Sequence, residues 1–117
     1  AESIGYNQKV ARGEDLLTGY SKIVRMGPGQ IYAGGTTIAE REVGRIGVGV
    51  MIERAKEEDT EWSFYDSWNK FLENADRVSS KKYLDVEGDY YYRVRCIHSA
   101  GQDMSSSFTN GVYIEEP

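Results

Sequence analysis

The stretch GDYYYRVRCIHSAG, residues 88–101, determines the fold class. Within it Tyr92 and Val94 alternate with Arg93 and Arg95, so that successive side chains point to opposite sides of the chain. This two-residue period is typical of a half-buried β-strand, whereas a helix requires a period of 3.6 residues. The small residues at its end indicate a turn.

A second segment, IGVGVMI at residues 46–52, repeats the same period. Its β-branched side chains fall on one face, where they favour a sheet core, and Gly47 and Gly49 fall on the other. The small outward face leaves room for a neighbouring group or bends the strand.

Turn-forming residues divide the rest of the chain into further short strands. We expect them over residues 21–26, 30–39 with an interruption at Gly34 and Gly35, 62–71, 83–86 and 108–115. Residues 27–29 predict a tight turn, residues 56–61 predict a charged hairpin tip, and residues 72–80 fit either a short helix or a turn. In the last strand Phe108, Val112 and Ile114 are expected to share one face.

These elements predict an all-β protein, an antiparallel sandwich of about seven short strands with an immunoglobulin-like or fibronectin type III-like layout. Residues 1–19 lack periodicity and are interpreted as a flexible N-terminal arm, with one helical turn near residues 14–17. Residues 20–117 are then a single domain, which suits the length of 117 residues.

Charge and composition exclude several classes of partner. The net charge is −5 and the 14 basic residues are scattered, which disfavours nucleic acid and anionic membrane surfaces. No apolar run is long enough for membrane insertion. Cys96 is the single cysteine, so no intramolecular disulfide forms. The chain begins at Ala1 without Met, from which we expect a mature exported chain.

Residues 92–101 resemble the F strand and FG turn of fibronectin type III domains, and Leu84-x-Val86-x-Gly88 resembles their E strand and EF corner. The resemblance implies that Tyr92, or one of its two neighbours, is a corner tyrosine whose hydroxyl returns to upstream backbone. The tryptophan that those domains bury in their second strand is missing, which implies shared architecture rather than standard membership.

From about Tyr20 to Glu115 the chain resembles a family of small exported β-sandwich proteins of Gram-positive bacteria whose function is unknown. The matching segments are residues 46–54, Trp62-Ser63-Phe64 and residues 88–100. This resemblance implies architecture and a location outside the cell or at its surface. It implies no functional residues.

Cys96 and His98 lie two residues apart on one strand and therefore on one face. A thiolate and an imidazole in that arrangement can serve as nucleophile and base. Cys96 follows Val94 on the inward face, however, where a thiol acts as a small hydrophobic group, and we interpret it as a core residue. His98 is expected to be half exposed at the strand end.

Other chemistry has weaker signals. The acidic run of residues 57–61 lacks the glycine and interleaved Asp or Asn of calcium loops, so we interpret it as a solvated tip. No glycine-rich phosphate loop is present, and pairs of carboxylates occur by chance in any acidic protein. We therefore expect no catalytic residues, no metal and no cofactor, and a protein that is not an enzyme.

Aromatic residues are concentrated between residues 62 and 71. On a regular strand Trp62, Phe64 and Trp68 share one face, and Tyr65 and Phe71 share the other. One face has to pack on the core, and the other either forms an open platform or is covered by other segments. If it is open, Trp62, Trp68 and Tyr65 are the candidate ligand-binding residues.

The sequence thus predicts a non-catalytic, exported or cell-surface module with an unidentified ligand. Protein interaction or a structural role is the first interpretation. The alternative is a carbohydrate-binding module that uses the aromatic residues of the 62–71 strand. The partner is accordingly a protein or a glycan, and the oligomeric state stays open.

Overall fold

The computed structural model describes residues 1–8 and 15–117, apart from the Leu17 side chain. These residues form seven β-strands and no helix. The strands are β1 (Glu2–Tyr6), β2 (Leu16–Gly27), β3 (Gln30–Ala55), β4 (Ser63–Asp85), β5 (Tyr90–Ala100), β6 (Asp103–Phe108) and β7 (Val112–Ile114). All pair antiparallel in one sheet ordered β1-β2-β3-β5-β6, in which β4 also pairs with β3, and β7 with β5.

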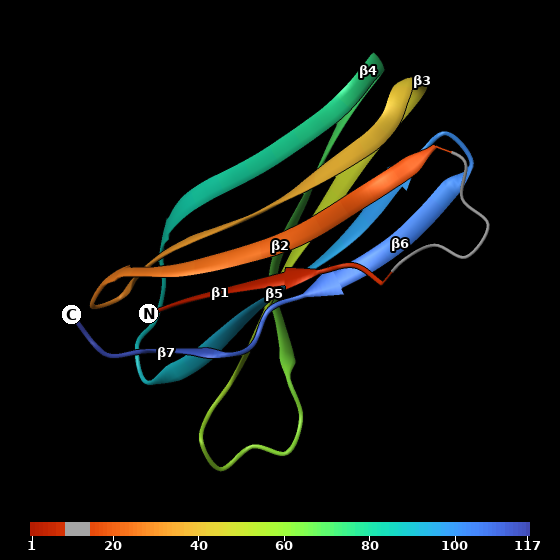
Figure 1. Ribbon diagram of the computed structural model, residues 1–117. Coiled ribbons are helices and arrows are strands. Elements are labelled where there is room, and N and C mark those ends of the chain that lie inside the picture. The colour runs from red at the N-terminus through yellow and green to blue at the C-terminus, as the bar shows by residue number, and fades with distance from the viewer. Residues whose placement is uncertain (9–14) are drawn as a thin grey trace.

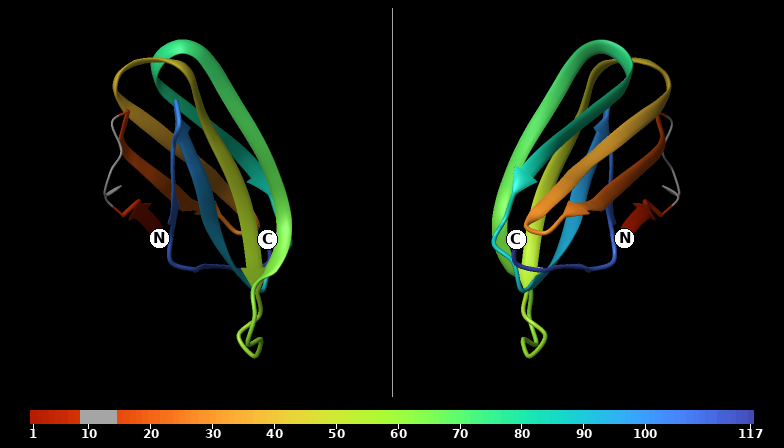
Figure 2. Two further views of the ribbon diagram at one scale, coloured as in Figure 1. Left: turned by 90° about the vertical axis from the view of Figure 1, so that its right-hand side faces the viewer. Right: turned by 90° about the vertical axis from the view of Figure 1, so that its left-hand side faces the viewer.

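The sheet forms two layers because β3 and β4 are long and bend together. The first part of β3 pairs with β2 and the second part with β5, while β4 accompanies β3 through both layers. Figure 1 shows β1, β2 and the first part of β3 in front of β5, and Figure 2 shows β3 and β4 arching from one layer into the other.

The bend coincides with a bulge. Between the pairs Ile38↔Arg77 and Val43↔Ala75, β3 advances five residues and β4 only two, so that β3 carries three extra residues. Extra residues on one strand increase twist and turn the pair. Asn74 lies at this corner of β4 with φ 53°, a left-handed conformation that asparagine tolerates well.

On the opposite side β1 approaches β6, and the sheet is nearly closed into a barrel. No ladder joins these two strands in the described residues. Hydrogen bonds from residues that follow the two strands connect them instead: Asn7, just after β1, donates from Nδ2 to Ser105 Oγ at 2.9 Å, and the backbone amide of Asn110, after β6, donates to Ser3 Oγ at 2.9 Å.

The core lies between the layers and is built from the inward positions of the strands. Val50 is 1% exposed and Val94 is 0% exposed, which confirms the period-two prediction for both segments. The fully buried aliphatic side chains come from both layers, namely Ile23, Ile31, Ile46, Val48, Val50, Ile52, Val78, Val94 and Ile114. Burying a side chain of this size contributes about 1.5–3 kcal/mol.

Tyr92 makes the hydrogen bond that was expected of a corner tyrosine. Its ring is buried, and its hydroxyl donates to the Glu87 carbonyl at 2.5 Å, five residues upstream. The expected return of this hydroxyl to upstream backbone is therefore confirmed.

The prediction for the N-terminal segment was wrong where the structure describes it. Residues 2–6 form β1, which pairs with β2 from Glu2↔Val24 to Tyr6↔Tyr20, in place of a loose arm. Leu16 begins β2 and does not belong to a helical turn. The remainder of the predicted arm, residues 9–14, lies outside the described residues.

The described residues form seven strands, in agreement with the expected number, but the lengths of the strands differ from the prediction. Residues 30–55 form one strand. Residues 72–80 continue β4 through its bend, so both predictions for this segment, a short helix and a turn, were wrong. A hydrophobic pattern reports local periodicity, and it cannot distinguish one bent strand from two straight strands.

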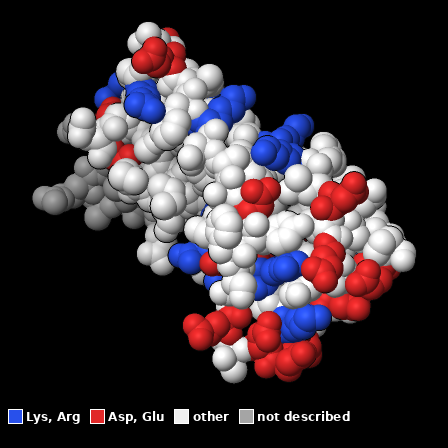
Figure 3. Space-filling view, turned by 180° about the vertical axis from the view of Figure 1, so that it is seen from behind, with Lys and Arg blue, Asp and Glu red and all other residues white. Residues whose placement is uncertain are grey.

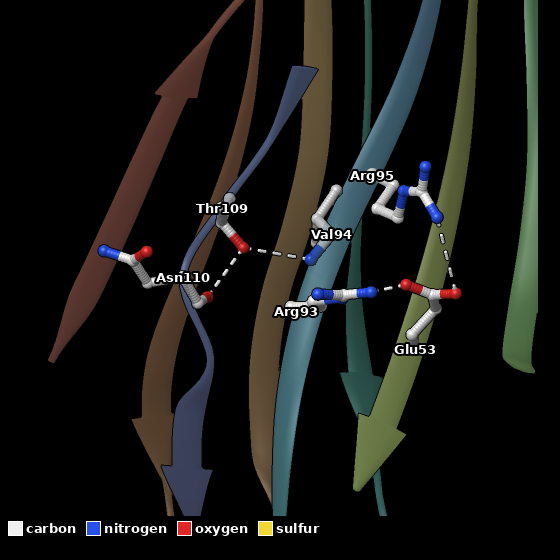
Figure 4. Close-up of polar contacts among 6 residues, drawn as sticks. All are labelled: Glu53, Arg93, Val94, Arg95, Thr109 and Asn110. Carbon is white, nitrogen blue, oxygen red and sulfur yellow. Dashed lines mark hydrogen bonds and ion pairs between the residues drawn. The ribbon is translucent and has the colours of Figure 1, made fainter. Parts of the chain in front are cut away.

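The last predicted strand is divided into β6 and β7. Between the pairs Arg95↔Phe108 and Tyr92↔Val112, β5 advances three residues and the returning chain four. One extra residue reverses the direction of the side chains, so Phe108 is 61% exposed, although Val112 is buried as predicted. At the break the Thr109 hydroxyl accepts a hydrogen bond from the Val94 amide, as Figure 4 shows.

Candidate functional site

The outward side of the layer formed by the second part of β3, the first part of β4, β5 and β6 carries an open groove. Its volume is about 800 Å³, and we call it the outer groove. It is lined by Arg45, Gly47, Gly49, Val50, Met51, Ser67, Asn69, Phe71, Arg95, Cys96, Ile97, Ser99, Met104 and Ser106. Figure 3 views this side of the molecule, where the acidic residues gather toward the end that carries the β3–β4 hairpin tip.

Two glycines keep the floor of the outer groove low. A Cβ at Gly47 would lie 2.4 Å from the Phe71 ring, and one at Gly49 would lie 2.8 Å from Asn69 Oδ1. The ring of Phe71 therefore lies directly over Gly47. The outward room expected at these two positions is partly filled by Phe71, and the rest is the groove.

The walls of the outer groove are apolar and exposed. Phe71, Ile97 and Met104 are among the large hydrophobic side chains that are open to solvent. An exposed apolar surface on a single layer is a common feature of interaction sites. Asn69, Ser99 and the other polar lining residues add hydrogen-bonding groups between the apolar ones.

The charge of the outer groove is opposite to that of the whole protein. Its described lining contains Arg45 and Arg95 and no Asp or Glu, although the net charge of the chain is −5. The Arg45 guanidinium lies 4.3 Å from the centre of the Phe71 ring. The Glu53 carboxylate lies 2.8 Å from Arg93 Nε and 3.9 Å from Arg95 Nη1. Both interactions are drawn in Figure 4. Arg95 is half exposed, so its guanidinium still faces solvent.

The structure separates the three predicted ligand-binding residues. Tyr65 packs edge-on against Tyr92, with ring centres 5.5 Å apart. Trp68 packs against the core cluster and donates from Nε1 to Ser80 Oγ at 3.0 Å. Trp62 is half-buried, and the Arg93 guanidinium lies 4.4 Å from its ring.

The predicted division of faces was also wrong. Between the pairs Ile52↔Asp66 and Glu53↔Phe64, β3 advances one residue and β4 two. The extra residue places Trp68, which pairs with the inward Val50, on the opposite side from Phe64. Phe71 pairs with Gly47 and shares the outward side with Phe64. Nothing in the local sequence indicates this bulge.

The sequence reasoning missed a second outward surface, on the layer formed by β1, β2, the first part of β3 and the second part of β4. Cross-strand pairs place Tyr6 beside Tyr20, and Tyr32 beside Tyr83. Lys22 and Lys81 flank Gly34 between them. We call this surface the tyrosine–lysine face; its members are Tyr6, Tyr20, Lys22, Tyr32, Lys81 and Tyr83.

Cys96 and His98 both point inward, as expected, but neither reaches solvent. Burial raises the pKa of the Cys96 thiol to about 11, so the thiol is protonated at neutral pH. His98 is 0% exposed, which corrects the expectation of a half-exposed side chain, and burial lowers its pKa to about 4. The pair therefore lacks the thiolate and the access that nucleophilic catalysis requires.

His98 belongs to a buried hydrogen-bond chain that connects the two layers. The Thr37 hydroxyl donates to the Gly47 carbonyl at 2.8 Å, so it accepts from His98 Nδ1 at 2.8 Å. His98 Nε2 then accepts from the Ser107 hydroxyl, also at 2.8 Å, and Ser21 donates to Ser107 at 2.6 Å. The neutral ring with its proton on Nδ1 satisfies every partner.

The acidic tip is held locally. The Asp59 carboxylate accepts a hydrogen bond from the Lys56 amide at 2.8 Å, which closes the turn between β3 and β4. Among the described residues no group of three or more His, Cys, Asp or Glu side chains is arranged to hold a metal ion. None of the described segments is a helix long and apolar enough to span a bilayer.

The outer groove and the tyrosine–lysine face are thus two surfaces whose composition points to ligands. No family model, curated protein or solved structure matches the chain.

Proposed function

We propose that the protein is a non-catalytic interaction module that binds an extended peptide segment in the outer groove. The segment carries apolar side chains with an acidic residue at one or both ends. The observation that carries the proposal is the groove lining, which combines exposed Phe71, Ile97 and Met104 with two arginines and no described carboxylate.

Charge complementarity selects the acidic partner. In a protein of net charge −5, an anionic segment is repelled by most of the surface and is attracted where arginines line an apolar groove. Arg45 is stacked on Phe71, so its guanidinium is positioned before binding, and less side-chain entropy is lost when a carboxylate binds.

We also infer that the nearly closed sheet is a variant of the immunoglobulin-like or fibronectin type III-like sandwich. The two-layer arrangement and the hydrogen bond from Tyr92 to Glu87 support this relationship. On the resemblance to exported Gram-positive proteins, we propose that the module is secreted or held at the cell surface. Fractionation of cells that produce it, followed by immunodetection, tests the location.

Sugar binding at Trp62, Tyr65 and Trp68 is less favoured by the geometry. Tyr65 and Trp68 pack against the core cluster, and the Trp68 indole nitrogen is already bonded to Ser80. The three rings therefore do not offer one continuous platform.

Selection from a displayed library of random heptapeptides tests the groove proposal. We expect enriched peptides to combine apolar residues with terminal Asp or Glu. Their affinity, measured by fluorescence anisotropy, should fall about tenfold in the double variant Arg45→Gln/Arg95→Gln. The Gly49→Val variant should weaken binding similarly, because its side chain projects into the groove floor.

Gly44→Val is the matched control, since a Cβ at Gly44 meets no atom within 4 Å and the residue does not line the groove. Equal loss in both glycine variants would contradict the proposal, as would enrichment of basic peptides. A dimer in sedimentation velocity that Gly49→Val abolishes would show that a second copy covers the groove, and would overturn the peptide proposal.

A further inference from the structure

The tyrosine–lysine face contains a hollow that is chemically unlike the outer groove. Its volume is about 330 Å³, which lies within the range of small-molecule sites. It is lined by Tyr20, Tyr32, Gly35, Thr36, Lys70, Ser79, Ser80 and Lys81. We call it the lysine hollow. Hydroxyl and ammonium groups dominate its lining, and no described carboxylate takes part.

The two lysines come from the two parts of β4 that the bend separates. Lys81 lies on the second part, and Lys70 reaches the hollow from the first part. Among the described residues, neither ammonium group has a carboxylate within the 4.0 Å of an ion pair. Two unpaired cations beside one hollow repel each other, and an anion bound between them removes that repulsion.

Aromatic rings form another side of the hollow. The Tyr32 ring is half-buried, and its centre lies 6.0 Å from Lys81 Nζ. The Tyr20 ring is held against Tyr6, with ring centres 5.6 Å apart. The C–H groups of a pyranose carry partial positive charge and pack on the negative face of such a ring, while the phenol hydroxyl bonds to sugar hydroxyls.

A hydroxyl pair completes the lining. Thr36 Oγ1 and Ser79 Oγ share a hydrogen bond of 2.6 Å between neighbouring strands. In that pair one hydroxyl keeps a free proton and both keep acceptor capacity, which suits the hydroxyl groups of a sugar. An isolated inorganic anion would leave the rings and most of this capacity unused.

We propose that the lysine hollow binds an anionic sugar residue. The ring packs on Tyr20 or Tyr32, the hydroxyl groups bond to Thr36 and Ser79, and the carboxylate or phosphate lies between Lys70 and Lys81. This site is separate from the outer groove, so the module holds a peptide segment on one side and an acidic glycan on the other.

Isothermal titration of the full chain tests the proposal with three probes: trigalacturonate, glucose 6-phosphate and neutral maltotriose. We expect measurable affinity for at least one anionic sugar and none for maltotriose. Comparison of the first two probes distinguishes a carboxylate from a phosphate. The affinity should decrease as the salt concentration rises.

Three variants locate the site. The double variant Lys70→Gln/Lys81→Gln should lose about tenfold in affinity, and Tyr32→Leu should also weaken binding. Lys82→Gln removes the same charge from the neighbouring position, where the ammonium lies 4.6 Å from the Trp68 ring outside the hollow lining. We expect it to stay within about twofold of the unmodified chain.

Several outcomes would overturn the proposal. These are equal binding of maltotriose, equal loss in Lys82→Gln, binding of inorganic phosphate as tight as that of the sugars, and no binding of either anionic sugar at millimolar concentration. Gly49→Val serves to separate the two sites, because it should weaken peptide binding about tenfold and leave sugar binding intact. Failure of one site then leaves the other testable.

Discussion

The outer groove and the tyrosine–lysine face lie on the outward sides of the two layers of the folded sheet, and their chemistry differs. The groove has a floor of backbone at Gly47 and Gly49 and walls of aliphatic and aromatic side chains. The tyrosine–lysine face has paired phenol rings and lysines around Gly34. The core beneath both is made of the same β-branched side chains. Inward positions therefore specify the fold, and outward positions determine the chemistry of the two surfaces.

β4 makes this contrast possible. Its first part contributes Asn69 and Phe71 to the groove, and after the bend at Asn74 its second part contributes Ser79 and Lys81 to the other face. A single edge strand thus serves two surfaces. The charges along β4 also limit pairing of this edge with another chain.

The largest expected effect is a loss of stability at low pH. It tests the buried hydrogen-bond chain through His98, which connects the layers that carry the two surfaces. The imidazole pKa is about 4 in the folded protein and 6.5 when exposed, so the unfolded state binds more protons between these values. The contribution of His98 to the free energy of unfolding is fully present above pH 6.5. As the pH decreases toward 4, the protein loses about 3 kcal/mol of this contribution. Urea unfolding at pH 7 and pH 4 measures the loss.

The control is His98→Gln, whose amide can bond to Thr37 and Ser107 but does not titrate. Its loss of stability between pH 7 and pH 4 should be smaller than that of the unmodified chain by about 3 kcal/mol. An identical pH dependence in both proteins would contradict the buried neutral imidazole. Cys96 does not contribute, because its thiol is protonated throughout this range.

The second prediction compares a glycine from each face. A Cβ at Gly34 would lie 2.5 Å from the Ser80 carbonyl oxygen, and backbone cannot move aside easily. Gly34→Ala should therefore cost about 1–3 kcal/mol of unfolding free energy. The equivalent Cβ at Gly49 would lie 2.8 Å from Asn69 Oδ1, which can rotate away, and 3.9 Å from the Ile97 carbonyl oxygen, an ordinary contact. Gly49→Ala should therefore stay within about 1 kcal/mol of the unmodified chain. Urea denaturation of both variants measures the difference. A larger loss of unfolding free energy in Gly49→Ala than in Gly34→Ala would contradict this account of the two glycines.

The smallest expected effect comes from the hydrogen bond of the Tyr92 hydroxyl. Tyr92→Phe removes the hydrogen bond to the Glu87 carbonyl and should cost about 1 kcal/mol in thermal or urea unfolding. Because Tyr92 lines neither the groove nor the lysine hollow, binding at both sites should be unchanged. A change in either affinity would show that the two faces depend on this corner.

The sequence allowed the strand class, the turn at residues 27–29 and the corner tyrosine to be predicted, because each depends on local pattern. Three bulges prevented more. One makes β3 and β4 bend, one at Tyr65 divides the aromatic residues between two sides, and one before Val112 turns Phe108 outward. A single extra residue reverses all following side chains and leaves no mark in composition.

The candidate sites were harder to predict than the fold. The tyrosine–lysine face collects residues from four strands, and its pairs are distant in sequence, such as Tyr32 and Tyr83. The role of His98 depends on Thr37 and Ser107, which come from other strands. The small outward face at Gly47 and Gly49 was the one local signal of the outer groove, and it was visible in the sequence.

The most direct test of the two-faced account is an amide chemical-shift titration of one isotope-labelled sample with each ligand in turn. A selected acidic peptide should shift amides around Gly49 and Ile97, and trigalacturonate should shift those around Tyr32 and Lys81, with additive changes when both are present. If the two ligands shift the same amides, or if either displaces the other, two independent binding faces do not exist.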